Sequence, residues 1–147
     1  MKAPLLPAAQ RGVAAVEFAL IASVFFTVLF GVMEMGRLLW TWNAAVEATR
    51  FGTRLAVVCD LNDTIIKTRM IGRLPSLTNS NITVTYLNPP NAANTCDSAT
   101  CKAVRVSLTG YTHTTIIPLV PLSLTLPPFS TTLRKEFMQS GANEVCQ

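Results

Sequence analysis

The sequence contains few of the residues and motifs that catalysis requires. His113 is its only histidine and lies in a threonine-rich stretch with no carboxylate nearby in the sequence, so we expect a surface or hairpin residue rather than a general base. Serine and aspartate occur without a G-x-S-x-G motif, and there is no Walker loop and no G-x-G-x-x-G run. These absences argue against an enzyme and against a bound cofactor.

Charge is scarce as well. Only 14% of the residues are charged, and the net charge is +4, of which Lys2 and Arg11 near the N-terminus supply two units. A nucleic-acid-binding domain of this size normally carries a larger and clustered positive charge. We therefore expect no nucleic-acid partner.

Residues 13–33 lack proline and carry a single charged side chain, Glu17. Valine, alanine, phenylalanine, leucine and isoleucine dominate this run, and nothing in it interrupts a helix. A helix of this length spans roughly 30 Å, the thickness of the hydrocarbon core of a bilayer. The run therefore predicts a membrane-spanning helix in contact with lipid.

Glu17 is the exception that this helix has to accommodate. A carboxylate at mid-bilayer costs about 2.5 to 3.5 kcal/mol, and less near the interface. No lysine or arginine follows it within the segment, and Arg11 lies six positions back, on a different face of the helix. Its partner is then either in another subunit or the positive charge of a new chain N-terminus just upstream. Both alternatives indicate processing and assembly.

The run RGVAAVEF, residues 11–18, followed by an apolar stretch, resembles the processing site of type IV pilin-like proteins. In that family a prepilin peptidase cuts after the glycine, and a glutamate is the fifth residue of the mature chain. The resemblance implies cleavage between Gly12 and Val13. It also implies that Glu17 and Phe18 take part in assembly.

Two further segments resemble TadE-like proteins, which are minor pilins or pseudopilins of the tight adherence pilus system. They are GVMEMGRLLWTWNAAVEATRFGTRLAVV, residues 31–58, and VRVSLTGYTHTTIIPLVPLSLTL, residues 104–126. Residues 87–103 match no pattern of that family. The resemblance implies a structural protein that supports adhesion and biofilm formation. Its implied partners are the prepilin peptidase, other pilins or pseudopilins of the same system and the inner-membrane assembly platform.

These features divide the chain into a leader peptide (1–12), a transmembrane helix (13–35) and an extracytoplasmic pilin-like domain (36–147). Basic residues flank the apolar run on both sides, so the positive-inside rule does not fix its orientation. The processing motif and the cysteines favour a bacterial inner-membrane protein with a cytoplasmic N-terminus. The alternative is an uncleaved, single-pass anchored binding module of the cell envelope.

The predicted fold is α+β, with the transmembrane helix continuing to about Val58. Apolar residues beyond Met33 recur at steps of three and four, as in a helix packed on a core. Trp40 and Trp42 fall where an interfacial aromatic belt would lie. Three glycines allow either bending or close packing of the helix, and we favour packing: Gly31, Gly36 and Gly52.

A short second helix is expected from an N-cap at Asn62, with Asp63 in its first turn, to about Arg73, before Pro75. Alternating apolar and polar residues predict an antiparallel sheet of about three strands. Their predicted ranges are 81–87, 103–111 and 130–138, with Leu133 and Phe137 on the third. The prolines of residues 116–128 exclude a regular helix or a central strand. This segment is either a loop covering the sheet or a contact surface, and it is our candidate for a subunit contact.

Four cysteines in an exported domain favour disulfides. Cys96 and Cys101 are close in sequence at the expected tip of a hairpin. Their pairing would leave Cys59 and Cys146 as a second pair, tying the tail to the long helix. A zinc site would need four converging ligands, and the sequence has neither a C-x2-C pair nor a histidine cluster, so we expect no metal.

Overall fold

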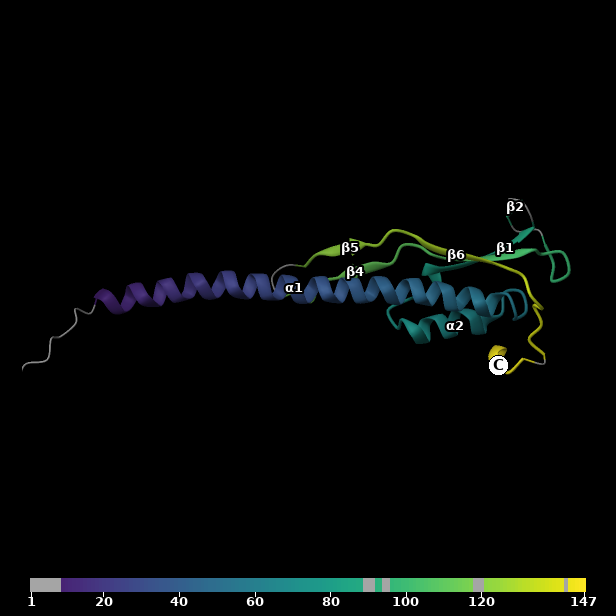
Figure 1. The fold of residues 1–147 in the computed structure, drawn as a ribbon, viewed down its shortest axis with the longest axis horizontal. Coiled ribbons are helices and arrows are strands. Elements are labelled where there is room, and N and C mark those ends of the chain that lie inside the picture. The colour runs from purple at the N-terminus through teal and green to yellow at the C-terminus, as the bar shows by residue number, and fades with distance from the viewer. Residues whose placement is uncertain (1–8, 89–91, 94–95, 118–120, 142) are drawn as a thin grey trace, which may run out of the picture.

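The computed structural model describes residues 9–88, 92–93, 96–117, 121–141 and 143–147 (Figure 1). The predicted α+β class is confirmed. The helices are α1 (Ala9–Ala56), α2 (Thr64–Arg73) and two short 3-10 turns, Asn79–Asn81 and Glu144–Cys146. The strands are β1 (Ile82–Asn88), β2 (Ala92–Ala93), β3 (Ala103–Leu108), β4 (Thr112–Thr114), β5 (Ser123–Thr125) and β6 (Phe129–Arg134). The first eight residues of the predicted leader lie outside the described part of the chain.

The C-terminal half of α1 lies between the sheet and α2, which pack against different sides of it (Figure 1). Its buried positions are mostly small residues: Thr41, Ala45, Ala48, Thr49, Gly52, Thr53 and Ala56. A Cβ atom on Gly52 would lie 2.2 Å from Sδ of Met70 in α2. The close-packing interpretation is therefore confirmed for Gly52, whereas a Cβ on Gly31 or Gly36 would meet nothing within 4 Å.

The main sheet is antiparallel with strand order β2-β1-β3-β6. The predicted alternation is confirmed, because Val104, Val106 and Leu108 of β3 are at most 1% exposed and their intervening neighbours are more accessible. The third strand was predicted to reach Met138, which is wrong, since β6 ends at Arg134. Beyond it, the N–H groups of Glu136 and Met138 donate to the carbonyl of Val57 at the end of α1.

Two local predictions need correction. The predicted third strand included Phe137, but this residue lies beyond β6 and its side chain is 87% exposed. The N-cap of α2 is Asp63 rather than Asn62, and its carboxylate accepts the N–H of Ile65. Asn62 has a φ of 59°, and its N–H donates to the hydroxyl of Tyr86 at 2.7 Å. That bond holds Asn62 in the turn before the helix, so the cap falls one residue later.

Strands β4 and β5 form a second, two-stranded sheet that the sequence did not predict. They extend the β3–β6 pair without a change of register, because Leu108 faces Phe129, Thr112 faces Thr125, and the N–H of Leu126 donates to the carbonyl of Tyr111 between them. The ladder is interrupted where two prolines, which have no N–H to donate, lie opposite Thr109 and Gly110. We call residues 112–117 and 121–125 the outer hairpin; its strands lie along α1, nearer the N-terminus of that helix than β6 and α2 (Figure 1).

The two predicted disulfide pairs are present. Cys59 is bonded to Cys146, which ties the C-terminal tail to the end of α1, and Cys96 is bonded to Cys101 in the loop before β3. The structure holds no free cysteine among the residues it describes.

Candidate functional site

The N-terminal half of α1 projects beyond the domain (Figure 1). Its apolar side chains are exposed. Val13 is 59% exposed and Phe18 is 74% exposed. By length and composition, α1 is the one helix in the described part of the chain that could cross a membrane. Such a surface is stable only when lipid or other helices cover it.

The predicted processing site lies within this helix. Because α1 begins at Ala9, the bond between Gly12 and Val13 is in its first turn, and a Cβ on Gly12 would meet no other atom within 4 Å. Glu17 lies one turn beyond Val13 and is exposed. Among the described residues, no side chain pairs with Glu17, so a partner for its carboxylate would have to come from outside this fold.

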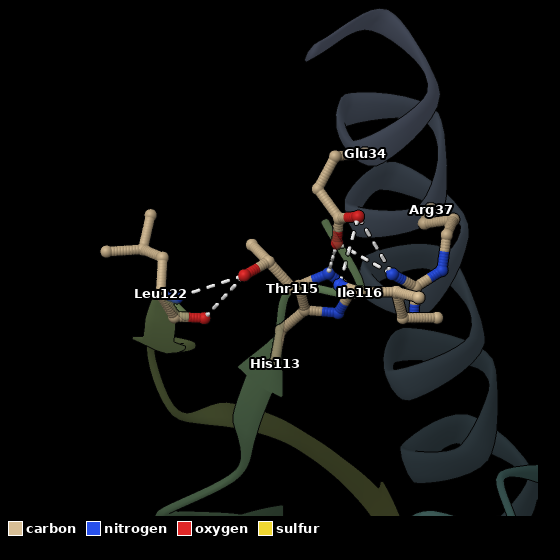
Figure 2. A network of polar contacts seen from close by, with 6 residues as sticks. All are labelled: Glu34, Arg37, His113, Thr115, Ile116 and Leu122. Atoms are coloured by element: carbon tan, nitrogen blue, oxygen red, sulfur yellow. Dashed lines mark hydrogen bonds and ion pairs between the residues drawn. The ribbon is translucent and has the colours of Figure 1, made fainter. Parts of the chain in front are cut away.

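A second carboxylate, Glu34, lies at the end of the apolar run, and both of its oxygens accept hydrogen bonds. Nη1 of Arg37 donates to Oε1 at 2.7 Å and to Oε2 at 2.9 Å. Nε2 of His113 lies 2.9 Å from Oε1, and the N–H of Ile116 donates to Oε2 at 3.4 Å. Figure 2 shows these groups converging on the carboxylate from α1 and from the outer hairpin. Since a carboxylate only accepts, Nε2 of His113 carries the hydrogen in this bond.

These contacts fix the outer hairpin on α1. His113 is only 6% exposed and lies on the inner face of β4, and the Glu34 side chain is 14% exposed. Next to the turn, Thr115 N–H donates to the carbonyl of Leu122 at 3.0 Å. Leu122 N–H also donates to the Thr115 hydroxyl at 2.9 Å (Figure 2). The prediction of a surface histidine was therefore wrong, although its placement in a hairpin was right.

The Glu34 network holds two elements together. Its carboxylate and guanidinium belong to α1, and its imidazole and backbone amide belong to the outer hairpin. No group of three or more histidine, cysteine, aspartate or glutamate side chains that could bind a metal occurs within the residues described. The arrangement cancels the charge of Glu34 with that of Arg37 where the helix leaves its apolar run.

Sequence reasoning missed this network because its parts are far apart in the chain. Glu34 was treated as one polar position of an amphipathic helix, and His113 as an isolated residue. One signal was available: Glu34 directly follows the apolar run and therefore needs charge-compensating partners there, and Arg37, one turn later, is only one of them.

In the part of the chain that the structure describes, one helix is long and apolar enough to cross a membrane, and it continues into a small disulfide-bonded α+β domain. Comparison with known families adds one finding: residues 12–54 match the model of TadE-like proteins. The match covers the exposed half of α1 and most of the half that carries the domain, and the predicted resemblance is confirmed over these residues. No curated protein and no solved structure matches the chain.

Proposed function

We propose that this protein is a structural minor pilin or pseudopilin of a tight adherence pilus, supporting adhesion and biofilm formation. In this proposal a prepilin peptidase removes residues 1–12 on the cytoplasmic side of the bacterial inner membrane. Residues 13–35 then span the membrane, and residues 36–147 form the extracytoplasmic domain. Helix α1 enters the pilus, or its assembly complex on the inner-membrane platform, beside other pilins.

The observation that carries this proposal is the overlap of the TadE-like match with an exposed helix. The match covers residues 12–54, and the first half of this segment has apolar side chains that the domain leaves uncovered. A helix that only anchors a domain needs an apolar surface but no carboxylate such as Glu17. A helix that packs among other subunits can place Glu17 beside the amine of Val13, its own or a neighbour's, which offsets the cost of burying the charge.

The decisive test is the N-terminal sequence and intact mass of the protein from its native membranes, with and without the prepilin peptidase. We expect a chain that begins at Val13 only when the peptidase is present. A chain that begins near Met1 in both strains would contradict the pilin pathway and favour an uncleaved, anchored binding module.

The same strains test the role of Glu17. Glu17→Ala should leave cleavage largely intact but abolish or strongly reduce incorporation into pili, measured by immunoblotting sheared pilus fractions. Glu47→Ala is the matched control, because Glu47 is an exposed glutamate of α1 that pairs with Arg50 in the domain half of the helix. Normal pili in the Glu17 variant would contradict the assembly role.

A further inference from the structure

We infer that the outer hairpin has a lipid-contacting tip and provides a second membrane contact beside α1. The tip consists of the described apolar residues on either side of the turn, Ile116, Ile117 and Leu122. Its occupant is the interfacial layer of the bilayer that α1 spans. This inference rests on α1 crossing a membrane, and it is independent of cleavage at Gly12 and of incorporation into a pilus.

The first argument is the level at which the tip lies. The N–H of Ile116 bonds to Glu34, and Ile116 and Ile117 line one groove together with Phe30, Met33 and other residues of the same stretch of α1. The apolar run of α1 ends at Met33, after about 30 Å of helix. The tip is therefore level with the boundary between hydrocarbon and headgroups, directly beside the membrane-spanning helix.

The second argument is the distribution of polarity over the hairpin. The outward residues of its strands are hydroxyl-bearing and exposed: Thr112, Thr114, Ser123 and Thr125. At the tip the exposed side chains become apolar, with Ile116 at 70% and Leu122 at 58%. The one exposed apolar side chain within the two strands, Leu124 at 47%, is on the face that carries His113 rather than on the outward face. An element that is polar where it is remote from the membrane and apolar where it reaches the boundary matches the polarity gradient of a bilayer interface.

The third argument concerns the polar groups that such a position would desolvate. The hydrocarbon chains of lipid form no hydrogen bonds with N–H or C=O groups, so polar groups that reach their boundary need partners within the protein. At this level Thr115 and Leu122 bond to each other across the hairpin, and Ile116 N–H bonds to Glu34. The charge of Glu34 is balanced by Arg37 at 2.7 Å. These polar groups beside the tip are thus already paired.

The experiment uses the full chain with Ile116→Cys or Leu122→Cys, labelled with an environment-sensitive fluorophore. Because all four native cysteines are in disulfides, the introduced thiol is the one that reacts under non-reducing conditions, and intact mass verifies both bridges. The protein is reconstituted in phosphatidylethanolamine and phosphatidylglycerol vesicles that contain lipids with a nitroxide quencher near the headgroup or near the chain end. Phe137→Cys is the matched control, since Phe137 is 87% exposed but lies beside residues bonded to the far end of α1.

We expect the labels at 116 and 122 to lose most of their emission with the quencher near the headgroup and less with the deep quencher. The label at 137 should keep its emission with both. Quenching should also be unchanged when the protein is diluted in excess lipid. If the labels at 116 and 122 keep as much of their emission as the label at 137, the inference is overturned. Protection from quenching that appears with cross-linking between copies would also overturn it, by assigning the tip to a contact with a second copy.

Discussion

Glu34 and His113 are 79 positions apart in the sequence, yet their side chains are joined by a 2.9 Å hydrogen bond. The imidazole is buried on the hairpin side of this bond, whereas Arg37 reaches the carboxylate from a half-exposed position on the helix. Loss of the imidazole would leave Glu34 with its arginine but would remove the side-chain bond between the hairpin and α1. The pair therefore determines how firmly the outer hairpin is docked.

Replacing His113 should loosen the outer hairpin without unfolding the domain. His113→Ala removes a part-buried hydrogen bond to a carboxylate that also accepts the N–H of Ile116, so the hairpin keeps one of its two bonds to Glu34. We expect faster amide hydrogen exchange in residues 113–116 and 122–124, while β1 and β3 keep their protection. Thr112→Ala is the control, because Thr112 is the outward-facing neighbour. Equal exchange in both variants would show that the bond does not dock the hairpin.

Asp97 organises the loop that Cys96 and Cys101 close. Its carboxylate accepts the hydroxyl and N–H of Thr100 and the N–H of Ala99. The pKa of Asp97 lies below its ordinary value, and the hydrogen bonds from Thr100 are the main cause; they outweigh the smaller effect of desolvation, which raises it. A lowered pKa in the folded state means that the carboxylate stabilises the loop above the ordinary aspartate pKa, and that this contribution is lost as the pH falls through the lowered value.

The amide resonances of Ala99 and Thr100 should therefore shift together on acidification. The midpoint of this transition should lie at a pH below the ordinary aspartate pKa of about 3.9. This can be followed by NMR on the isotope-labelled full chain in detergent. In Asp97→Asn the transition should disappear. A midpoint at or above the ordinary value would contradict the hydrogen-bonding role.

Among the elements, those with a strong local pattern were predicted and those defined by their partners were not. Helix α1 was predicted because its apolar run and its period of three and four residues are local properties; its end at Ala56 falls two residues before the predicted one. The alternation in β1 and β3 was equally local. The outer hairpin was missed because its register is set by strand pairing across the turn, and prolines on both sides of β5 suggested a loop.

Helices α1 and α2 are in close contact at Gly52. Met70 of α2 is fully buried over Gly52, so a methyl group at this position of α1 has no space. Gly52→Ala should therefore destabilise the domain by about 1 to 3 kcal/mol through overpacking. Thermal unfolding in detergent, followed by circular dichroism, would measure it.

Gly36→Ala is the matched control on the same helix, since an added Cβ there meets no atom within 4 Å. It should leave the domain unchanged or stabilise it by up to about 1 kcal/mol, because alanine favours a helix over glycine. A Gly52 variant as stable as the Gly36 variant would show that α2 yields to the added methyl group.

At the scale of the whole molecule, a single helix serves two environments. Its first half, which projects beyond the domain (Figure 1), exposes large apolar side chains, and its second half packs small ones against the sheet and α2. The sequence predicted this division and both pairs of cysteines. It could not predict the docking of the hairpin on α1, because the docking depends on a contact between Glu34 and His113. No local sequence pattern predicts a contact between positions so far apart.

The disulfide bond between Cys59 and Cys146 also affects how the protein would transmit a pulling force. It joins the chain just after α1 to a residue 87 positions further on. A pulling force that enters along α1 and leaves beside Cys146 is transmitted through the sulfur bridge, so the segment between the two cysteines carries none of it. Fully extended, that segment would add roughly 300 Å of length. While the bridge is intact, unfolding of the segment between the two cysteines does not lengthen the path over which the protein transmits tension.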